Sequence, residues 1–353
     1  VMNKKILWWG RSDLNYSRNS ICQNLLQDLG YEIINFSPHF SSLAHIEILF
    51  RGIKDIHLVW VPCFRHRDLI SAKKWALSNS VPLIFDPFIS AWDKQVYERN
   101  KYLPDSNGAL NLKHWESKLF NSADLLIADT KMHMNMFINE FQVNPNKILV
   151  LNVGADDRIF KPSLPIELGS DIHILFYGSF ISLHGASIIA EAAIKLSNHK
   201  NLFWTFLGSG PELNKIKKMT RSFPNIKFEN NIEYHKLSWR IKKAHILLGI
   251  FSKSRKANNV IPNKVYQSLA CGRLVITRSS DAYPPLRGGV NSGIFFVPPE
   301  DSNALKNTIL QLLKAPDKIV TAGKNAQKTY ENNFSAEKIK KQMLAVLKAA
   351  RQR

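Results

Sequence analysis

A lysine in the second half of the chain stands where the backbone is suited to hold an anion. Lys264 follows Pro262 and Asn263 at the expected start of a helix that ends at Gly272, and a basic loop, residues 253–256, precedes them. No acidic residue occurs between residues 253 and 272. A helix N-terminus offers unpaired N–H groups and the positive end of a dipole. The pattern predicts a diphosphate clamp, with a solvated run of charge as the alternative.

An earlier loop brings glycine and histidine to a second helix start. Gly178 and Ser179 follow an apolar run, and His184 with Gly185 precedes a segment of helical period. Glycine lets the backbone approach a phosphate closely, and His184 is a candidate donor to it. A plain turn with a surface histidine would have the same residues.

A third loop follows the next apolar run. It reads Gly208-Ser209-Gly210, and Pro211 suits the first turn of a helix. Leu213 stands where a GxGxxG motif has its last glycine, so this loop alone is weak evidence for nucleotide binding.

The elements that must position these loops are strands and helices in alternation. The expected strands of the first half are 5–9, 32–36, 57–61, 83–85, 124–128 and 148–151, and those of the second half are 172–177, 202–207, 226–228, 245–250, 274–277 and 294–297. Such alternation predicts parallel sheets joined by right-handed crossovers. We therefore expect an α/β protein with two doubly wound, Rossmann-like domains, each binding ligands beyond the carboxyl ends of its strands.

Length and loop composition place the domain boundary. A chain of 353 residues exceeds what one hydrophobic core usually serves. Residues 161–165, Lys-Pro-Ser-Leu-Pro, are typical of an interdomain linker. We expect a first domain over residues 1–160, a second over 165–334, and a basic C-terminal helix over 335–353 that packs on the first domain.

The formal charge of +20 is concentrated in the second half of the chain. Residues 1–160 hold 18 basic and 16 acidic residues, whereas residues 161–353 hold 30 basic and 12 acidic residues. This bias favours an anionic partner, either a nucleotide diphosphate, a lipid phosphate or an anionic membrane surface. Solubility in a lysine-rich proteome is the plainer explanation.

Cysteine spacing and hydropathy exclude several classes of protein. Cys22, Cys63 and Cys271 are far apart and show no ligand spacing, so the sequence predicts neither a disulfide framework nor a zinc site. No run of about 18 apolar residues occurs. We expect a cytoplasmic protein, with association to a membrane surface as an option. No Asp-x-Asp pair is present to hold a metal–diphosphate complex, so no catalytic metal is expected.

Five segments in order resemble the donor domain of retaining GT-B glycosyltransferases of family 4. They are residues 176–185, 206–213, 244–248, 261–272 and 297–301, and residues 152–162 resemble the family's usual crossing between domains. The resemblance covers roughly residues 120–330. It implies two domains facing each other across a cleft, a nucleotide-diphosphate sugar as co-substrate, and no further cofactor.

The resemblance also implies which residues bind the donor. The candidates are Gly10, Gly178, Ser179, Gly208, Gly210, Asn259, Val260, Ile261, Pro262, Asn263, Lys264 and Gln267. Two glutamates eight positions apart flank the donor loop in many members, and Asn259 and Gln267 stand at those places here. Ser179 and His184 stand where members often carry arginine and lysine. We infer that Lys264 and the basic loop supply the missing positive charge.

Fewer residues of the first half match the family. Asp86 ends a strand where many members have a histidine near the donor sugar, so Asp86 and His184 are the candidate catalytic residues. A plain capping role is the alternative for Asp86. On the acceptor side the candidates are Arg11, Arg18, Asn19, Trp92 and Asp93, and residues 86–121 are the expected acceptor surface.

The implied reaction transfers a sugar to an acceptor hydroxyl with retention of configuration, in glycan or glycolipid assembly. Positioning and positive electrostatics can carry such a reaction without a carboxylate nucleophile. The acceptor is a glycan, a glycolipid or a small molecule, and the sequence names neither the base nor the sugar. Loss of both glutamates leaves a donor-binding pseudoenzyme or partner subunit as an alternative. A nucleic-acid-binding protein is disfavoured because the basic residues form no nucleic-acid module.

Overall fold

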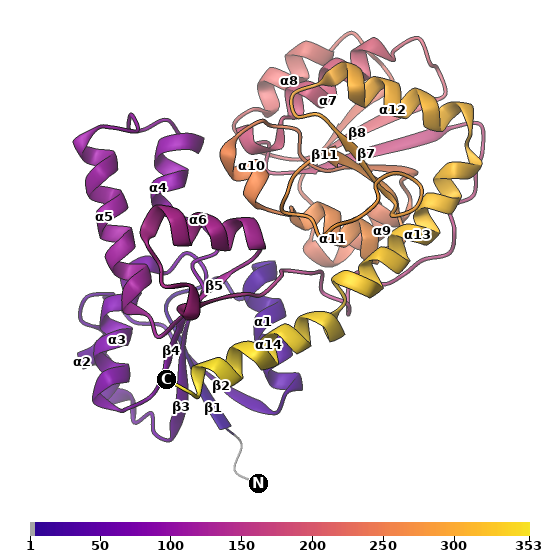
Figure 1. Ribbon diagram of the computed structural model, residues 1–353. Coiled ribbons are helices and arrows are strands. Elements are labelled where there is room, and N and C mark those ends of the chain that lie inside the picture. The colour runs from indigo at the N-terminus through magenta and orange to yellow at the C-terminus, as the bar shows by residue number, and fades with distance from the viewer. Residues whose placement is uncertain (1–3) are drawn as a thin grey trace. The chain divides into compact units, whose positions relative to one another are not determined.

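The computed structural model describes residues 4–353 and divides the chain into two compact units. Unit 1 contains the chain up to Val153 together with Ala336–Arg353, and unit 2 contains Gly154–Ser335. Each unit is built on a parallel sheet of six strands with flanking helices (Figure 1). The predicted α/β class with two doubly wound domains is confirmed.

The sheet of unit 1 has the strand order β2-β1-β3-β4-β5-β6. Its strands are β1 (Lys4–Trp9), β2 (Tyr31–Phe36), β3 (Ile56–Val61), β4 (Leu83–Phe85), β5 (Leu125–Ala128) and β6 (Ile148–Val150). Apart from the edge strand β2, they are nearly continuous apolar runs because helices cover both faces of a parallel sheet. The order reverses at β1, so the loops after β1 and β3 diverge there, as expected of a ligand-binding edge.

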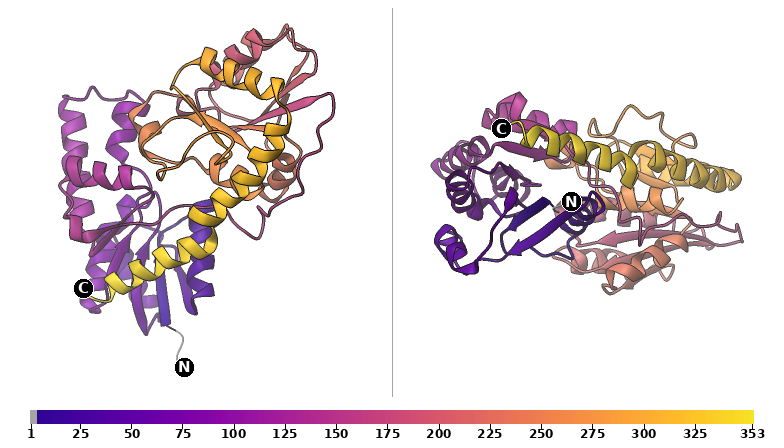
Figure 2. Two further views of the ribbon diagram at one scale, coloured as in Figure 1. Left: turned by 45° about the vertical axis from the view of Figure 1, so that its right-hand side comes forward. Right: turned by 90° about the horizontal axis from the view of Figure 1, so that it is seen from below.

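The helices of unit 1 include one from the far end of the chain. They are α1 (Ser17–Asp28), α2 (Ala44–Glu47), α3 (Leu69–Ser78), α4 (Ala91–Asp93), α5 (Asn107–Ser122), α6 (Lys131–Phe141) and α14 (Ala336–Ala350). Helix α14 lies beside α1 in Figures 1 and 2 and buries Ile339, Met343 and Val346. The Gln342 amide donates to the side chain of Asn152 and accepts from its backbone N–H.

The sheet of unit 2 has the strand order β12-β11-β10-β7-β8-β9. Its strands are β7 (Ile172–Gly178), β8 (Leu202–Gly208), β9 (Ile226–Glu229), β10 (Ile246–Leu248), β11 (Val275–Arg278) and β12 (Ile294–Val297). Its helices are α7 (Ala186–Lys195), α8 (Leu213–Thr220), α9 (Tyr234–Lys242), α10 (Arg255–Asn259), α11 (Asn263–Ala270), α12 (Ser302–Lys314) and α13 (Asp317–Asn333). The order reverses between β7 and β10, next to the loop that contains Gly178.

The division between the units falls before the segment that we expected to be the linker. Phe160 is fully buried and its ring packs on Tyr234, and the Ser163 hydroxyl donates to the carbonyl of Cys271. The Tyr330 hydroxyl bonds to the backbone of Ala155. Residues 154–165 therefore belong to unit 2, where Ala155, Phe160 and Ser163 find their partners.

Each of the twelve expected strands has a counterpart in the structure. The largest difference is at residues 245–250, where the strand β10 covers only Ile246–Leu248. Within residues 4–353, the structure has no helix that combines the length and the apolar character needed to span a bilayer.

Candidate functional site

The carboxyl edge of the unit 2 sheet brings Gly178, His184 and Lys264 together. Gly178 ends β7 with φ of +152°, a conformation that favours glycine. A Cβ at this position would lie 2.8 Å from the His184 ring and 2.9 Å from the Lys264 ammonium. Only glycine at position 178 therefore lets these two side chains lie against the end of the strand.

His184 and Lys264 form a buried pair at this edge. The Lys264 ammonium donates to His184 Nε2 at 3.0 Å, and both residues are 7% exposed. If Nε2 accepts this bond, the neutral ring carries its proton on Nδ1, and Nδ1 has no partner among the described residues. The pair therefore presents an unused, buried N–H donor beside a cation.

Burial controls the charge of both side chains. It lowers the pKa of Lys264 to about 7, and burial together with the nearby Lys264 and Lys256 lowers the pKa of His184 to about 2. His184 is therefore neutral at physiological pH, whereas Lys264 is close to its midpoint. No carboxylate of residues 4–353 forms an ion pair with Lys264, so an added anion would favour the protonated lysine.

Two helices, α7 and α11, begin next to this pair. His184 precedes Gly185, the N-cap of α7, and Lys264 is the second residue of α11, whose N-cap is Pro262. Neither helix start has a capping side chain or an acidic residue in its first turn. Uncapped N–H groups, a positive dipole end and a lysine without an acidic partner among residues 4–353 are the features that suit an anion. The sequence predicted both helix starts and the residues that flank them.

The side-chain amide of Gln267 hydrogen-bonds to two tyrosines. Its Oε1 accepts from the Tyr177 hydroxyl at 2.8 Å, its Nε2 donates to the Tyr234 hydroxyl at 3.4 Å, and its side chain is 4% exposed. Asn259, the other residue at a family glutamate position, ends α10 and is 7% exposed. Neither tyrosine is given a role in the sequence-based predictions. The available sequence signal for Tyr177 is its position directly before Gly178 at the end of β7.

The loop after β8 lies against the loop after β7. Gly210 has φ of +152°, and a Cβ there would overlap the carbonyl of Ser179. The backbone N–H of Glu212 donates to the carbonyl of Phe180 at 3.0 Å. The two loops therefore form one rigid rim, with Ser179 exposed and Gly208 buried in it.

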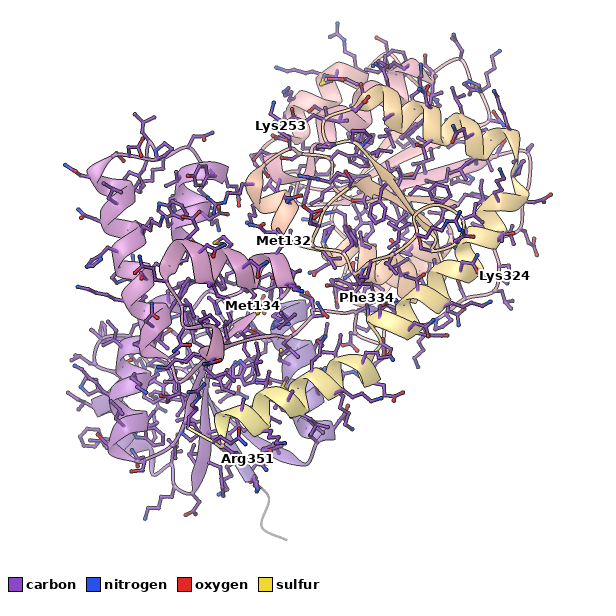
Figure 3. The ribbon with its side chains drawn as sticks, viewed as in Figure 1. Met132, Met134, Lys253, Lys324, Phe334 and Arg351 are labelled. Atoms are coloured by element: carbon purple, nitrogen blue, oxygen red, sulfur yellow. The ribbon has the colours of Figure 1, made fainter. Side chains whose placement is uncertain are left out.

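The basic loop contributes less charge to the site than its composition suggested. Lys253 is 74% exposed and pairs with Glu300 at 2.9 Å. In Figure 3 it lies at the edge of unit 2, near α10. Lys256 acts on His184 through its charge, as described above. The remaining donor-loop residues, Val260, Ile261, Pro262 and Asn263, connect α10 to α11.

In unit 1, Arg18 and Asp86 form a buried ion pair at the carboxyl edge of the sheet. Arg18 Nε donates to Asp86 Oδ2 at 2.8 Å, and the residues are 1% and 2% exposed. Arg18 Nη1 also donates to the carbonyls of Leu151 and Asn152. Burial raises the pKa of Asp86, and the Arg18 guanidinium opposes that rise. Asp86 therefore fixes an arginine that ties α1 to the end of β6, and it does not cap a helix.

The other candidates near the first strand differ in exposure. Gly10 ends β1 with φ of +130°, where a Cβ would contact Asp68 and Arg65. Arg11 is exposed, whereas Asn19 is 2% exposed and donates to the carbonyl of Asp13. Only Arg11 of these is accessible within the unit.

Trp92 and Asp93 lie inside unit 1 and not on a surface for an acceptor. They are 4% and 3% exposed, and the Trp92 ring packs on Phe141 and Tyr97. The buried Glu116 holds the start of α4 by accepting from the backbone N–H of Trp92 at 2.9 Å. This helix start is a structural device that the sequence pattern alone does not distinguish from a binding loop.

An aspartate and a histidine after β5 escaped the sequence analysis. Asp129 Oδ1 lies 2.7 Å from His133 Nδ1, and both residues are buried. Thr130 caps α6 between them by accepting from the His133 backbone N–H. The sequence signal that could have revealed this pair is an acidic residue directly after a strand with a histidine four positions later.

No three His, Cys, Asp or Glu side chains gather to hold a metal ion within the described chain. The candidate residues therefore fall into two groups. One is the set around Lys264 in unit 2, and the other is the set around Arg18 in unit 1. Asp86 and His184, the two candidate catalytic residues, lie in different units, and their catalytic role stays a prediction.

Comparison with known families supports the reading of unit 2. Residues 171–315 match the family model described as "Glycosyl transferases group 1". This stretch contains β7 to α12, and with them Gly178, His184, Lys264 and Gln267. The resemblance noted in the sequence is confirmed at this level. No curated protein matches the sequence.

Solved structures share the fold of the chain at low sequence identity. HepE from Anabaena, crystallised with UDP, is 16% identical with a TM-score of 0.72, covering 98% of this chain and 100% of HepE. Sucrose-phosphate synthase from Thermosynechococcus elongatus is 15% identical with a TM-score of 0.72, covering 98% of each chain. A glycosyltransferase from Rickettsia africae is 14% identical with a TM-score of 0.74, covering 99% of each chain.

Proposed function

We propose that this protein is a glycosyltransferase that moves a sugar from a nucleotide-diphosphate donor to an acceptor hydroxyl. The observation that carries the proposal is the His184–Lys264 pair between two uncapped helix N-termini, with no carboxylate partner in the described part of the chain. The family model matches the part of the chain that builds this site. HepE has been crystallised with UDP and with UDP-glucose, which supports a uridine nucleotide as the first donor to test.

The diphosphate of the donor would bind at this pair. A protonated Lys264 and the Nδ1–H of His184 supply donors, and the N-termini of α7 and α11 supply backbone N–H groups and positive dipole ends. Departure of the nucleoside diphosphate increases negative charge on its terminal phosphate. Donors fixed in advance on that phosphate stabilise the transition state more than the ground state.

Retention of configuration and independence of metal are part of the proposal. Positive charge at the leaving group performs the task that a divalent cation performs in other transferases. The departing phosphate can take the proton of the acceptor hydroxyl on the same face, so no carboxylate nucleophile is required. The acceptor is a glycan, a glycolipid or a small molecule.

Binding is tested first, with a thermal-shift screen against UDP, GDP, ADP and their sugars. We expect one nucleotide series to raise Tm, and we expect Lys264→Ala to lose that response. Lys324→Ala, a surface lysine of α13, is the matched control and should respond like the wild type. Lys324 projects from the outer side of α13 in Figure 3. No response to any nucleotide, with circular dichroism showing a folded protein, contradicts the proposal.

A donor-binding pseudoenzyme is the second candidate, and the state of Gln267 favours it. The amide that stands at a family glutamate position is already bound to Tyr177 and Tyr234. Release of free nucleoside diphosphate that depends on added acceptor separates the two candidates. Tight donor binding without such release, over a panel of glycan and glycolipid acceptors, would favour the pseudoenzyme.

A further inference from the structure

One face of the unit 2 sheet carries polar side chains at its β9 edge. Leu175 of β7 pairs with Thr205 of β8, and Thr205 pairs with Lys227 of β9, so these three side chains point to the same face. His173 lies two residues before Leu175 and shares this face. The opposite face carries Trp204 and Ile226, which belong to the apolar core. Helix α9 lies over the polar face, where Arg240 and Lys243 join it.

A pocket of about 260 Å³ separates α9 from these strands. It is lined by His173, Thr205, Arg240 and Lys243 among its polar residues. Arg240 Nη2 pairs with Glu229 at 2.5 Å, while its buried Nε has no partner among residues 4–353. The pocket thus offers an unused guanidinium N–H, a lysine and a hydroxyl to one small anionic group.

The exposed side of α9 places a tryptophan between two lysines. Lys236, Trp239 and Lys243 follow at spacings of three and four, so they share one face of the helix. Trp239 is 55% exposed, and the Lys243 ammonium lies 3.7 Å from its ring centroid. An exposed tryptophan flanked by lysines is the composition found where proteins meet the headgroup level of a bilayer.

The charge of this region exceeds what its own carboxylates neutralise. Residues 226–243 hold five lysines and arginines and two glutamates. Glu229 pairs with Arg240, and Glu233 pairs with Lys236. Lys227, Lys242 and Lys243 have no carboxylate partner within the described chain. This surface therefore attracts anions at its rim as well as in its pocket.

We propose that this α9 face binds the surface of an anionic phospholipid bilayer, with one lipid phosphate in the pocket beside Arg240 and Lys243. Trp239 then lies at the headgroup level, and Lys227, Lys236 and Lys242 face neighbouring headgroups. Nucleic acid fits less well, because one exposed tryptophan gives no row of stacking platforms and the pocket accepts a single phosphate. The inference goes beyond sugar transfer and does not depend on it.

Vesicle flotation of the full-length protein tests the proposal without nucleotide. Vesicles of phosphatidylcholine alone are compared with vesicles that contain 30% phosphatidylglycerol (about a third anionic lipid is enough to set a surface potential). We expect binding only to the anionic vesicles, weakening with salt. The variants Lys236→Gln and Lys243→Gln should each partition roughly fivefold more weakly than the wild type, which corresponds to about 1 kcal/mol per cation.

Matched variants show whether the effect belongs to this face. Lys215→Gln with Lys218→Gln removes two exposed lysines from α8, whose Ile216 packs on the opposite, apolar face of the sheet. This pair should leave partitioning within about twofold, because charge far from the headgroups is screened. Trp239→Ala should lose binding while retaining Tm, since the side chain is exposed. The proposal is overturned if both lysine pairs weaken binding equally, if Trp239→Ala binds normally, or if single-stranded DNA binds through these residues more tightly than the vesicles do.

Discussion

The depressed pKa of Lys264 makes donor affinity dependent on pH in a way that can be worked out. Burial lowers this pKa to about 7 before a donor binds. A bound diphosphate brings negative charge next to the ammonium and raises the pKa, so binding takes up a proton. Donor affinity is therefore constant well below pH 7 and falls as pH rises above it.

The magnitude follows from the fraction of lysine that is protonated before binding. With a pKa of about 7, roughly nine-tenths of the lysine is charged at pH 6 and about one-tenth at pH 8. The Kd of wild type should therefore rise about tenfold between these values, which is about 1.4 kcal/mol. Lys264→Ala should bind about 1.5–3 kcal/mol more weakly at pH 6, the scale of a hydrogen bond to a charged group. Its deficit should shrink by about 1.4 kcal/mol at pH 8.

Isothermal titration calorimetry with an intact nucleotide sugar measures this effect, because its diphosphate diester does not titrate in the range. Buffers of different ionisation enthalpy report the number of protons taken up. Lys264→Arg is the control for charge, since arginine stays protonated throughout and should flatten the profile. His184, with its pKa lowered to about 2, does not titrate here, so His184→Asn should keep the slope. A wild-type Kd that is flat from pH 6 to pH 8 refutes the reasoning, as does an unchanged slope in Lys264→Arg.

Two further predictions concern Gln267 and metal. Gln267→Leu should leave the buried Tyr177 hydroxyl with only its long, 3.4 Å bond to the Lys264 carbonyl, and should lower both stability and nucleotide affinity by about 1–3 kcal/mol. Gln267→Glu can accept from both tyrosines and should keep Tm and affinity. A leucine variant with unaltered Tm and affinity would remove Gln267 from the site. EDTA should leave turnover intact because Lys264 and the helix N-termini supply the positive charge, and activity that disappears and returns with manganese would contradict this.

The central strands were predictable from the sequence because they are short apolar runs buried on both faces, and the edge strands β2 and β9 keep an apolar alternation. Ile6 to Trp9 of β1 are at most 1% exposed, and such runs leave little freedom in where a strand begins. The unit boundary was not predictable to the residue. Proline and serine at positions 162–165 look like a linker in sequence, yet Ser163 and the preceding Phe160 are held by unit 2.

The site was predictable as a set of loops but not as a set of contacts. Gly178, His184 and Lys264 could be placed near each other because parallel strands end at one edge. The occupation of Gln267 by Tyr177 and Tyr234 depends on side chains from three elements, and no local pattern reports that. Trp92 was misjudged for a related reason: a tryptophan beside an aspartate fits a binding loop and a packed helix start equally well.

The resemblance to the family implies that this site lacks two positive and two negative charges, so the net charge of the lost groups is zero. Ser179 and His184 replace an arginine and a lysine, while Asn259 and Gln267 replace two glutamates. Losing only the glutamates would leave several cations crowded around Lys264, and losing only the cations would leave buried carboxylates unpaired, which is costly. With both pairs lost, Lys264 is the one buried ionisable cation at the His184 contact, and it can discharge by giving up its proton. The His184–Lys264 pair is then largely neutral above pH 7 and acquires its charge together with the donor, so proton uptake must accompany donor binding if the diphosphate lies where we propose.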